Sequence, residues 1–347
     1  MTEFTQTTEV LFLWNVEEKI KNYISEKFSD SSMVKFSYLT DYSKESEESS
    51  RLLPKANVII GWRPRKEWLE KAENLKLYIN PGTGVQNLIE IFRKLKESRG
   101  VILLNGRSHS RECAQHAVSL LMTFCGRIHL HDRWMRQGIW RRGDNDANGA
   151  SIPLTDRKIG FLGYGAINSK VHRLLSGFKS EFSALRKHWD KQKEKPPTPL
   201  KKYDFSQLHE FLTDIDTLII AAPLTSQTTE LIKMKELELL GKDGLVVNVG
   251  RGLIIHEESL YTALKQKVIN GAGIDVWYNY RPEPDEDGKK YPYSFPFHEL
   301  DNIVLSPHRA ASPMNQISRW DEHIENIKIF AEGREDFNNI VNLEDEY

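Results

Sequence analysis

Cysteine is scarce in this chain of 347 residues, which contains only Cys113 and Cys125. A disulfide framework would need several pairs and an oxidising compartment, so the scarcity favours a reducing, cytoplasmic location. Both cysteines fall within one predicted helix, and no His or Cys around them has the spacing of a zinc site. We therefore expect neither disulfides nor a bound metal.

Long hydrophobic runs are missing as well. No apolar stretch approaches the roughly 20 residues that span a bilayer. The polar start at 1–8 also lacks the apolar core of a signal peptide. The sequence therefore predicts a cytoplasmic protein with no membrane partner.

Charge of one sign does not dominate, because 48 Lys and Arg residues balance 49 Asp and Glu residues to a net charge of -1. No basic field indicates a nucleic-acid partner, and no acidic tail indicates a disordered segment. A local arginine could still bind an anionic substrate. Hydrophobic residues make up 39% of the chain, which is enough for the cores of two ordinary domains.

Short apolar runs, separated by helical patterns, recur in both halves of the chain. Such alternation is typical of parallel sheets covered by helices. The first series of predicted strands lies at 10–14, 58–61, 75–80 and 101–105. The second series lies at 158–162, 182–185, 217–221, 245–249, 271–276 and 302–305, and fits a doubly wound Rossmann domain.

Between the two series, apolar residues at three- and four-residue spacing predict one long helix over Cys113–Arg136. A Gly-, Asn- and Asp-rich loop follows at Arg141–Ala150. The Lys- and Pro-rich stretch Lys187–Lys202 is interpreted as a surface insertion. After Ser306 the pattern is helical and polar, and we expect the chain to return to the first domain there.

A dinucleotide fingerprint follows the predicted strand at 158–162. In GYGAIN, Gly163 permits a tight turn and Gly165 permits close approach of a pyrophosphate. Ala166 and Ile167 then begin a helix whose N-terminal amides favour phosphate. Asn168 replaces the third glycine, which normally allows close packing of the helix on the strand, so an ordinary glycine turn remains an alternative.

The end of the next predicted strand carries two cations where an acidic residue would bind the ribose of NAD. Arg186 and Lys187 suit a 2′-phosphate instead, through charge-assisted hydrogen bonds. The sequence therefore favours NADP(H) over NAD(H), although NAD remains possible. In the alternative interpretation, both cations simply begin the solvated insertion.

Together with further segments, the dinucleotide fingerprint gives the chain a resemblance to the D-isomer-specific 2-hydroxyacid dehydrogenase family over nearly its full length. The segments that carry the resemblance, in the family's order, are Gly82–Asn87, Arg133–Trp140, Gly163–Asn168, Ala222–Thr225, Val247–Gly252, Gly273–Trp277 and Ser306–His308. Several segments in this order are far more specific than the fingerprint alone.

The resemblance implies an α/β fold with two Rossmann-like domains, in which a flavodoxin-like substrate domain is split around an inserted dinucleotide-binding domain. The substrate domain is expected at 1–111 plus 309–347, and the cofactor domain at 112–308. The helix around Met122–Trp134, with its exposed aromatic positions, resembles the family's dimer arm, so a homodimer is expected.

Two catalytic residues follow from the resemblance. Arg251, in VGRG, matches the arginine that binds the substrate carboxylate and polarises the 2-oxo group, where its planar fork allows bidentate contact. His308 matches the acid–base histidine, whose ordinary pKa lies close to working pH. A lone Arg or His is more often a surface residue, but both stand at the ends of predicted strands.

The family's third catalytic position, an acid, is occupied here by Tyr280. Glu283 could take that role if the loop carries a three-residue insertion. We favour Tyr280, because it needs no insertion. Without an acid, the pKa of His308 should be raised less than it is in relatives.

Other site residues follow from the same resemblance. Gly84 and Val85 should meet the substrate carboxylate through their backbone amides. Gln115 replaces a hinge glutamate, and His109 and Arg111 lie in the same hinge region without an assigned role. The remaining cofactor-binding residues are expected to be Pro223, Val249, Gly250 and Asp275.

These observations predict an NAD(P)-dependent oxidoreductase that interconverts a small 2-oxo acid, such as glyoxylate or hydroxypyruvate, and its D-2-hydroxy acid. Two alternatives remain open at this stage. One is a nucleotide-sensing binding module like the C-terminal-binding-protein corepressors, favoured by Asn168 and Tyr280. The other is oxidation of formate or a similar small anion, suggested by the non-acidic third position.

Overall fold

The computed structural model describes the chain except for residues 1–6, 31–32, 43, 141–148, 193–194 and 313–315. It divides into two compact units, one formed by residues 1–109 with 315–347 and the other by residues 110–314. The predicted boundaries at 111/112 and 308/309 differ from this division by a few residues. As a consequence, the residues directly after His308 belong to the second unit.

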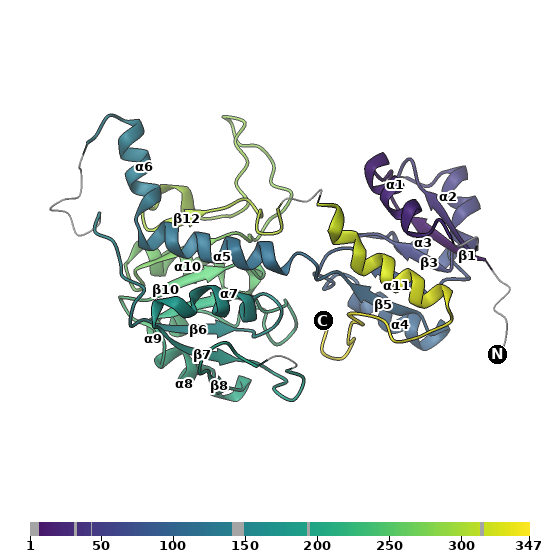
Figure 1. Cartoon of the computed structure of the whole chain (residues 1–347). Helices are drawn as coiled ribbons and strands as arrows, with labels where there is room; N and C mark the ends of the chain where they lie inside the picture. The colour runs from purple at the N-terminus through teal and green to yellow at the C-terminus, as the bar shows by residue number, and fades with distance from the viewer. Residues whose placement is uncertain (1–6, 31–32, 43, 141–148, 193–194, 313–315) are drawn as a thin grey trace. The chain divides into compact units, whose positions relative to one another are not determined.

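Unit 1 contains a five-stranded parallel sheet in the order β2-β1-β3-β4-β5, which is the flavodoxin-like order. Figure 1 labels β1, β3 and β5 of this sheet. Its strands are β1 (Thr8–Phe12), β2 (Val34–Tyr38), β3 (Val58–Ile60), β4 (Leu77–Asn80) and β5 (Ile102–Asn105). Its helices are α1 (Glu18–Lys27), α2 (Glu47–Leu52), α3 (Lys66–Lys71), α4 (Ile89–Arg99) and α11 (Asp321–Ala331), and short 3-10 turns occur at Leu53–Lys55 and Ile317–Trp320.

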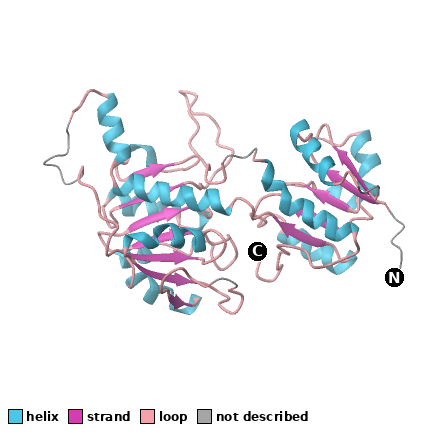
Figure 2. Cartoon of the chain, in the orientation of Figure 1, coloured by secondary structure: helices cyan, strands magenta, loops and turns pink. Residues whose placement is uncertain are grey.

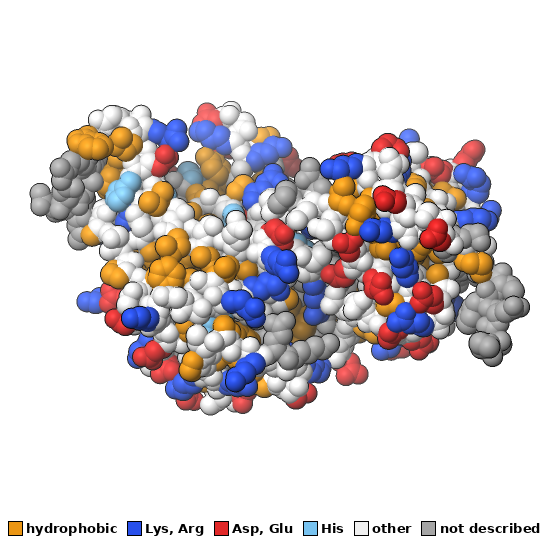
Figure 3. All heavy atoms as spheres, viewed as in Figure 1, with side chains coloured by type: hydrophobic (Ala, Val, Ile, Leu, Met, Phe, Trp, Pro, Cys, Tyr) orange, Lys and Arg blue, Asp and Glu red, His pale blue; other side chains and the backbone are white. Residues whose placement is uncertain are grey.

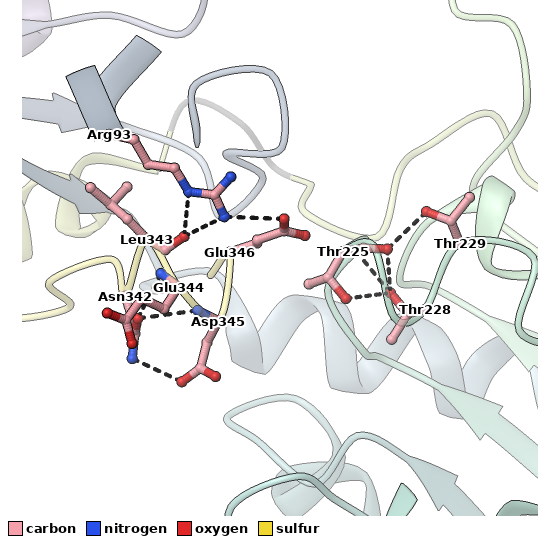
Figure 4. A network of polar contacts seen from close by, with 9 residues as sticks. All are labelled: Arg93, Thr225, Thr228, Thr229, Asn342, Leu343, Glu344, Asp345 and Glu346. Carbon is pink, nitrogen blue, oxygen red and sulfur yellow. Dashed lines mark hydrogen bonds and ion pairs between the residues drawn. The ribbon is translucent and has the colours of Figure 1, made fainter. Parts of the chain in front are cut away.

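Side chains alternate between the two faces of this sheet, because successive residues of a strand point to opposite sides. One face packs Val10, Phe12 and their neighbours against α1 and α11. The other face packs Leu11 and Ile59 against α3 and α4. The C-terminal segment runs alongside β5, and Val341 N–H donates to Leu103 O at 2.9 Å. Arg93 on α4 donates two hydrogen bonds to Leu343 O in that segment (Figure 4).

Unit 2 contains a seven-stranded parallel sheet in the order β12-β11-β10-β9-β6-β7-β8, a doubly wound Rossmann arrangement. Its strands are β6 (Lys158–Leu162), β7 (Glu181–Leu185), β8 (Lys201–Tyr203), β9 (Thr217–Ile220), β10 (Leu245–Asn248), β11 (Gly271–Ile274) and β12 (Ile303–Leu305). The central strands are buried on both faces, which explains why they read as continuous apolar runs.

Helices cover both faces of this second sheet (Figure 2). One face carries α5 (Ser110–Cys125) and α7 (Asn168–Leu175), and the opposite face carries α8 (Leu208–Thr213), α9 (Met234–Leu240) and α10 (Glu257–Lys265). Helix α6 (Ile128–Arg136) follows α5, and 3-10 turns occur at Ser176–Phe178, Phe205–Gln207, Gly252–Ile254 and Phe297–Glu299. No helix in the described part of the chain is both long and apolar enough to cross a membrane.

The prediction of one continuous helix over Cys113–Arg136 is wrong, because the structure has two helices there. The helix stops after Cys125, and Arg127 takes a left-handed φ of 53° before α6 begins at Ile128. Arg127 is buried and donates to Asn270 Oδ1 at 3.1 Å, which holds the break in place. Apolar residues continue in helical spacing on both sides of the break, so periodicity alone could not reveal it.

The aromatic positions of this region are not exposed as predicted, since Phe124 and Trp134 are both buried. The exposed large hydrophobic side chains are instead Met122 on α5, Ile128 and Met135 on α6, and Trp140 after it. In the predicted loop Arg141–Ala150, residues 141–148 lie outside the described part of the chain. Cys113 and Cys125 are both buried, and neither forms a disulfide bond within the described structure.

Candidate active site

The predicted site residues of unit 2 gather at the carboxyl ends of its parallel strands. Gly163 follows β6, Arg186 follows β7, Arg251 lies three residues after β10, and Ser306 follows β12. Strand order reverses between β6 and β9, and ligands of doubly wound sheets bind at such switch points.

The glycine turn lies at this reversal and has the properties of a pyrophosphate site. Gly163 has a φ of 82°, and a Cβ there would lie only 2.9 Å from the Cα of Ala222 on the neighbouring segment, so a larger residue is excluded. A Cβ on Gly165 would meet open space. Within the described residues, the N–H groups of Gly165, Ala166 and Ile167 make no hydrogen bond, which leaves three donors for an anion.

Asn168 is not an obstacle at the third fingerprint position. It begins α7, is almost completely buried, and its amide donates to Gly163 O at 2.6 Å and to Ile219 O at 3.2 Å. The asparagine therefore joins the turn to β9, where glycine would only permit close packing. This explains how the departure from the fingerprint is accommodated.

Arg186 lies at the edge of the same turn, because its Nη1 donates to Tyr164 O at 2.9 Å. Its guanidinium also lies 6.0 Å from the ring of Trp189. Lys187 is exposed beside it. The position predicted to contact the adenosine ribose therefore carries a cation fixed to the turn, and no acidic residue.

After β9, the loop that contains Pro223 is closed by Thr228. The buried Thr228 hydroxyl donates to Pro223 O at 2.7 Å. It also accepts the N–H of Thr225 at 2.8 Å (Figure 4). Such a side-chain-to-backbone turn fixes the loop without help from a ligand. Pro223 is thereby held next to the strand reversal.

Arg251 is a half-buried cation without a carboxylate partner among the described residues. Its guanidinium donates to Gly250 O at 2.7 Å, and Asn248 holds the segment by donating to Arg251 O at 2.9 Å. Val249 and Gly250 are buried at the end of β10. Burial lowers the pKa of Arg251. Since a buried charge is costly when unpaired, this arrangement favours an anionic ligand.

His308 and Tyr280 form a pair. The His308 Nδ1 lies 2.9 Å from the Tyr280 hydroxyl, which also accepts the N–H of Trp277 at 3.4 Å. Partial burial lowers the pKa of His308; the negative Asp275 opposes this shift and the positive Arg251 adds to it. Both rings remain accessible, with 46% of Tyr280 exposed.

Glu283, the alternative partner, is exposed and makes no hydrogen bond or ion pair with His308 in the described structure. The side chain that contacts the His308 ring is therefore the phenol of Tyr280, and not the carboxylate of Glu283. The catalytic roles of Tyr280, His308 and Arg251 stay predictions, but the structure brings the three residues together in unit 2.

Asp275 was predicted to bind the cofactor, and in the structure its carboxylate is enclosed by hydrogen bonds from the protein itself. It is completely buried, and its oxygens accept the Ser306 hydroxyl at 2.5 Å and the N–H groups of Arg309 and Ala310 at 2.7 and 2.9 Å. Burial opposes ionisation, but these bonds and one from His116 outweigh it and lower the pKa of Asp275. Asp275 thus anchors the segment around His308.

His116 on α5 was missed by the sequence reasoning. Its Nε2 lies 2.9 Å from Ser306 Oγ and 3.3 Å from Asp275 Oδ1. The contact joins residues 190 positions apart, and no local pattern indicates it. Its neighbours in the hinge prediction, Arg111 and Gln115, are exposed on the same helix.

In unit 1, the loop that contains Gly84 and Val85 is oriented by two buried asparagines. Asn80 donates to Gly82 O at 2.6 Å and to Gly84 O at 3.1 Å, and Asn105 donates to Thr83 O at 2.9 Å. The loop carbonyls are thus occupied, while the N–H groups of Thr83, Gly84 and Val85 bond to no described residue. These amides can bind a carboxylate.

The asparagines were also missed, although a signal was present. Asn80 and Asn105 end two adjacent predicted strands, and the structure pairs them in register. His109, which had no assigned role, is buried with its Nε2 3.0 Å from Thr83 Oγ1. It therefore contacts the same loop. No group of three or more metal-ligating side chains occurs in the described part of either unit.

Several known proteins are similar to this chain in sequence. Residues 118–310 match the family model described as D-isomer specific 2-hydroxyacid dehydrogenase, NAD binding domain. The chain is 30% identical over 283 residues to a glyoxylate/hydroxypyruvate reductase of Arabidopsis thaliana, covering 81% of each chain. It is also 30% identical over 284 residues to a glyoxylate reductase of Korarchaeum cryptofilum, covering 80% of this chain and 79% of the relative.

Solved structures show the same fold. An NADPH-dependent glyoxylate/hydroxypyruvate reductase of Sinorhizobium meliloti, in complex with NADP and malonate, superposes with a TM-score of 0.73 at 21% identity. The match covers 98% of both chains. The two-unit α/β architecture is therefore common to this chain and that reductase.

Proposed function

Because the chain belongs to the D-isomer specific 2-hydroxyacid dehydrogenase family, we propose that it reduces a small 2-oxo acid to its D-2-hydroxy acid with NADPH. Glyoxylate and hydroxypyruvate are the first candidate substrates. The observation that carries the proposal is Arg251, which has no carboxylate partner among the described residues and lies close to the His308–Tyr280 pair at the carboxyl end of the sheet.

Arg251 is the residue proposed to bind the substrate carboxylate. Its charge has no carboxylate partner among the described residues, and its planar fork matches a carboxylate in two parallel hydrogen bonds. Binding would pair the buried charge and bring a positive group to the 2-oxo oxygen. In unit 1, the amides of Thr83 to Val85 offer donors of the same kind.

His308 is proposed to transfer the proton. Reduction places a proton on the 2-oxo oxygen, and an imidazolium with a pKa near the working pH can supply it. Tyr280 bonds the other ring nitrogen and so fixes which nitrogen faces the substrate. The bound nicotinamide supplies the hydride to C2.

The residues around the glycine turn fit such a nucleotide, through three amides that have no hydrogen-bond acceptor among the described residues and through the open space at Gly165. The preference for NADPH rests on Arg186, fixed beside the turn where an acid would select NAD. The corepressor-like alternative does not require the Arg251–His308 arrangement. Formate oxidation transfers no proton to or from a hydroxyl group and leaves His308 without its proton-transfer role.

The proposal is tested by the oxidation of NADPH and NADH with a panel of 2-oxo acids, and by the reverse reaction with D- and L-hydroxy acids and with formate. Arg251→Ala and His308→Asn should each abolish turnover while nucleotide binding persists. Arg251→Lys should also be poor, since a lysine cannot form the bidentate contact. Formate turnover without 2-oxo acid reduction, or a fully active Arg251→Ala, would contradict the proposal.

We also propose that the protein is a cytoplasmic homodimer that associates through α6. Ile128, Met135 and Trp140 are 56%, 53% and 74% exposed. Figure 3 shows hydrophobic side chains gathered over this helix. Clustered apolar residues on a surface favour burial against a partner, and a second copy of the chain offers the same surface.

A further inference from the structure

The segment that carries His308 depends on one buried carboxylate. His308 has a φ of 57°, a left-handed conformation that a residue with a side chain rarely adopts. The two N–H groups that follow it, of Arg309 and Ala310, donate to Asp275 at 2.7 and 2.9 Å. On the other side, the Ser306 hydroxyl donates to the same carboxylate at 2.5 Å. These bonds hold the backbone on both sides of the histidine.

His116 completes this network from α5. The proton of the Ser306 hydroxyl is used in the bond to Asp275, so Ser306 Oγ accepts at 2.9 Å from the N–H at His116 Nε2. The same N–H lies 3.3 Å from Asp275 Oδ1. His116 therefore donates to the bonded pair, and Nε2 carries a proton in this arrangement.

This donor matters because Asp275 is completely buried. A completely buried carboxylate is stable only when its hydrogen-bonding capacity is met by the protein. Loss of the His116 N–H would leave Ser306 and Asp275 to rearrange, and the backbone bonds to Arg309 and Ala310 would change with them.

We propose that His116 is a positioning residue for the reaction: through Ser306 and Asp275 it holds the segment that presents the His308 ring to Tyr280 and to the substrate. The inference rests on the proposed function of His308. In the described structure His116 bonds to Ser306 and Asp275 and makes no hydrogen bond or ion pair with His308.

The test compares His116→Phe, which removes the donor, with His116→Gln, whose amide can donate from a similar position. His209→Leu is the matched control, because His209 forms another histidine–carboxylate pair in unit 2, with Glu236 at 2.8 Å, far along the chain from the His308 segment. The quantities to be measured are kcat, KM for the 2-oxo acid, and Kd for NADPH by fluorescence. We also record the ring proton signal of His308 by NMR, assigned by its absence in His308→Asn.

His116→Phe should lower kcat about tenfold or more, because small misplacements of a reacting group are costly. The Kd for NADPH should stay within about twofold, and His116→Gln should recover most of the lost rate. The His308 signal should shift in His116→Phe and not in His209→Leu. If His116→Phe does not fold, Ser306→Ala replaces it, with the same expected loss of kcat.

A kcat of His116→Phe within about twofold of the unmutated protein would overturn the inference. Equal impairment of His116→Gln and His116→Phe would also overturn it, because the donor would then not be the important property. A protein that reduces no 2-oxo acid refutes the proposed function alone. The His308 signal still decides the inference in that case, since it needs no turnover.

Discussion

Tyr280 gives His308 a neutral partner, and this sets the expected pH dependence of the reaction. Reduction uses the protonated imidazole, and partial burial lowers the pKa of His308. The rate of reduction should therefore fall as pH rises, starting from a more acidic pH than for a histidine paired with a carboxylate. In Tyr280→Glu, a carboxylate would raise the pKa of His308 and move this fall upward by at least about one pH unit.

The measurement is the pH profile of kcat/KM for 2-oxo acid reduction. Glu283→Gln is the control, because Glu283 is exposed and makes no contact with His308 in the described structure. Its profile should match that of the unmutated protein. A downward shift in Glu283→Gln would assign the partner role to Glu283 instead.

Arg186 is expected to decide between the two nucleotides. A charge-assisted bond to a phosphate contributes about 1.5–3 kcal/mol, so Arg186→Asp should weaken NADPH binding about ten- to hundredfold. NADH, which lacks the 2′-phosphate, should bind at least as well as before. Titrations of both nucleotides measure this, with the exposed Lys242→Asp at the opposite end of β10 as control. Equal Kd values for the two nucleotides in the unmutated protein would refute the preference.

Individual site residues could be predicted where the chemistry is local in sequence. The glycine turn and the position of Arg186 follow from counting along a strand and a helix, whereas Tyr280 as the partner of His308 was predicted only from the family resemblance. His116 and the environment of Asp275 could not be predicted. Their contacts with Ser306, Arg309 and Ala310 join α5 and the residue directly after β11 to a loop far along the chain.

At the scale of elements, strands were predicted wherever both faces are buried. The two that were missed, β2 and β8, lie at the edges of their sheets. β2 is mostly half-buried, and β8 begins with the exposed Lys201 and Lys202 inside the stretch interpreted as an insertion. An edge strand does not need an apolar run, because part of it can face solvent, so hydrophobicity reveals it only where such a run is present. The other two edge strands, β5 and β12, have apolar runs and were predicted.

Helix α6 should determine the oligomeric state. Ile128→Lys combined with Met135→Lys places two charges on the exposed apolar face, where burial against a second copy would leave them unpaired. The double variant should elute as a monomer in size-exclusion chromatography with light scattering, while the unmutated protein elutes as a dimer. Leu174→Lys, on an exposed position of α7, is the control. A dimeric double variant would place the interface elsewhere.

At the scale of the whole molecule, each unit has its own sheet and its own cores, so each should respond separately to ligands. The fingerprint and Arg186 both lie in unit 2. A hundredfold excess of NADPH over its Kd stabilises the binding unit by about 2.7 kcal/mol. For a unit of roughly 200 residues this raises Tm by about 5–11 °C.

Calorimetry of the full chain measures this effect. We expect two transitions, of which only the one assigned to unit 2 shifts with NADPH. Arg186→Asp should reduce the shift at the same NADPH concentration. A single transition, or an equal shift of both, would show that the units unfold together.

The C-terminal segment that runs along β5 also affects how readily the protein aggregates in concentrated solution. Asn339 O accepts from Asn105 N–H at 3.2 Å, and Val341 N–H donates to Leu103 O at 2.9 Å, so the outer rim of β5 is already hydrogen-bonded. An open rim of buried, β-prone residues is a template for strand addition by another molecule and hence for aggregation. By occupying that rim with its own backbone, the chain removes one nucleation point for fibres that its apolar strands would otherwise provide.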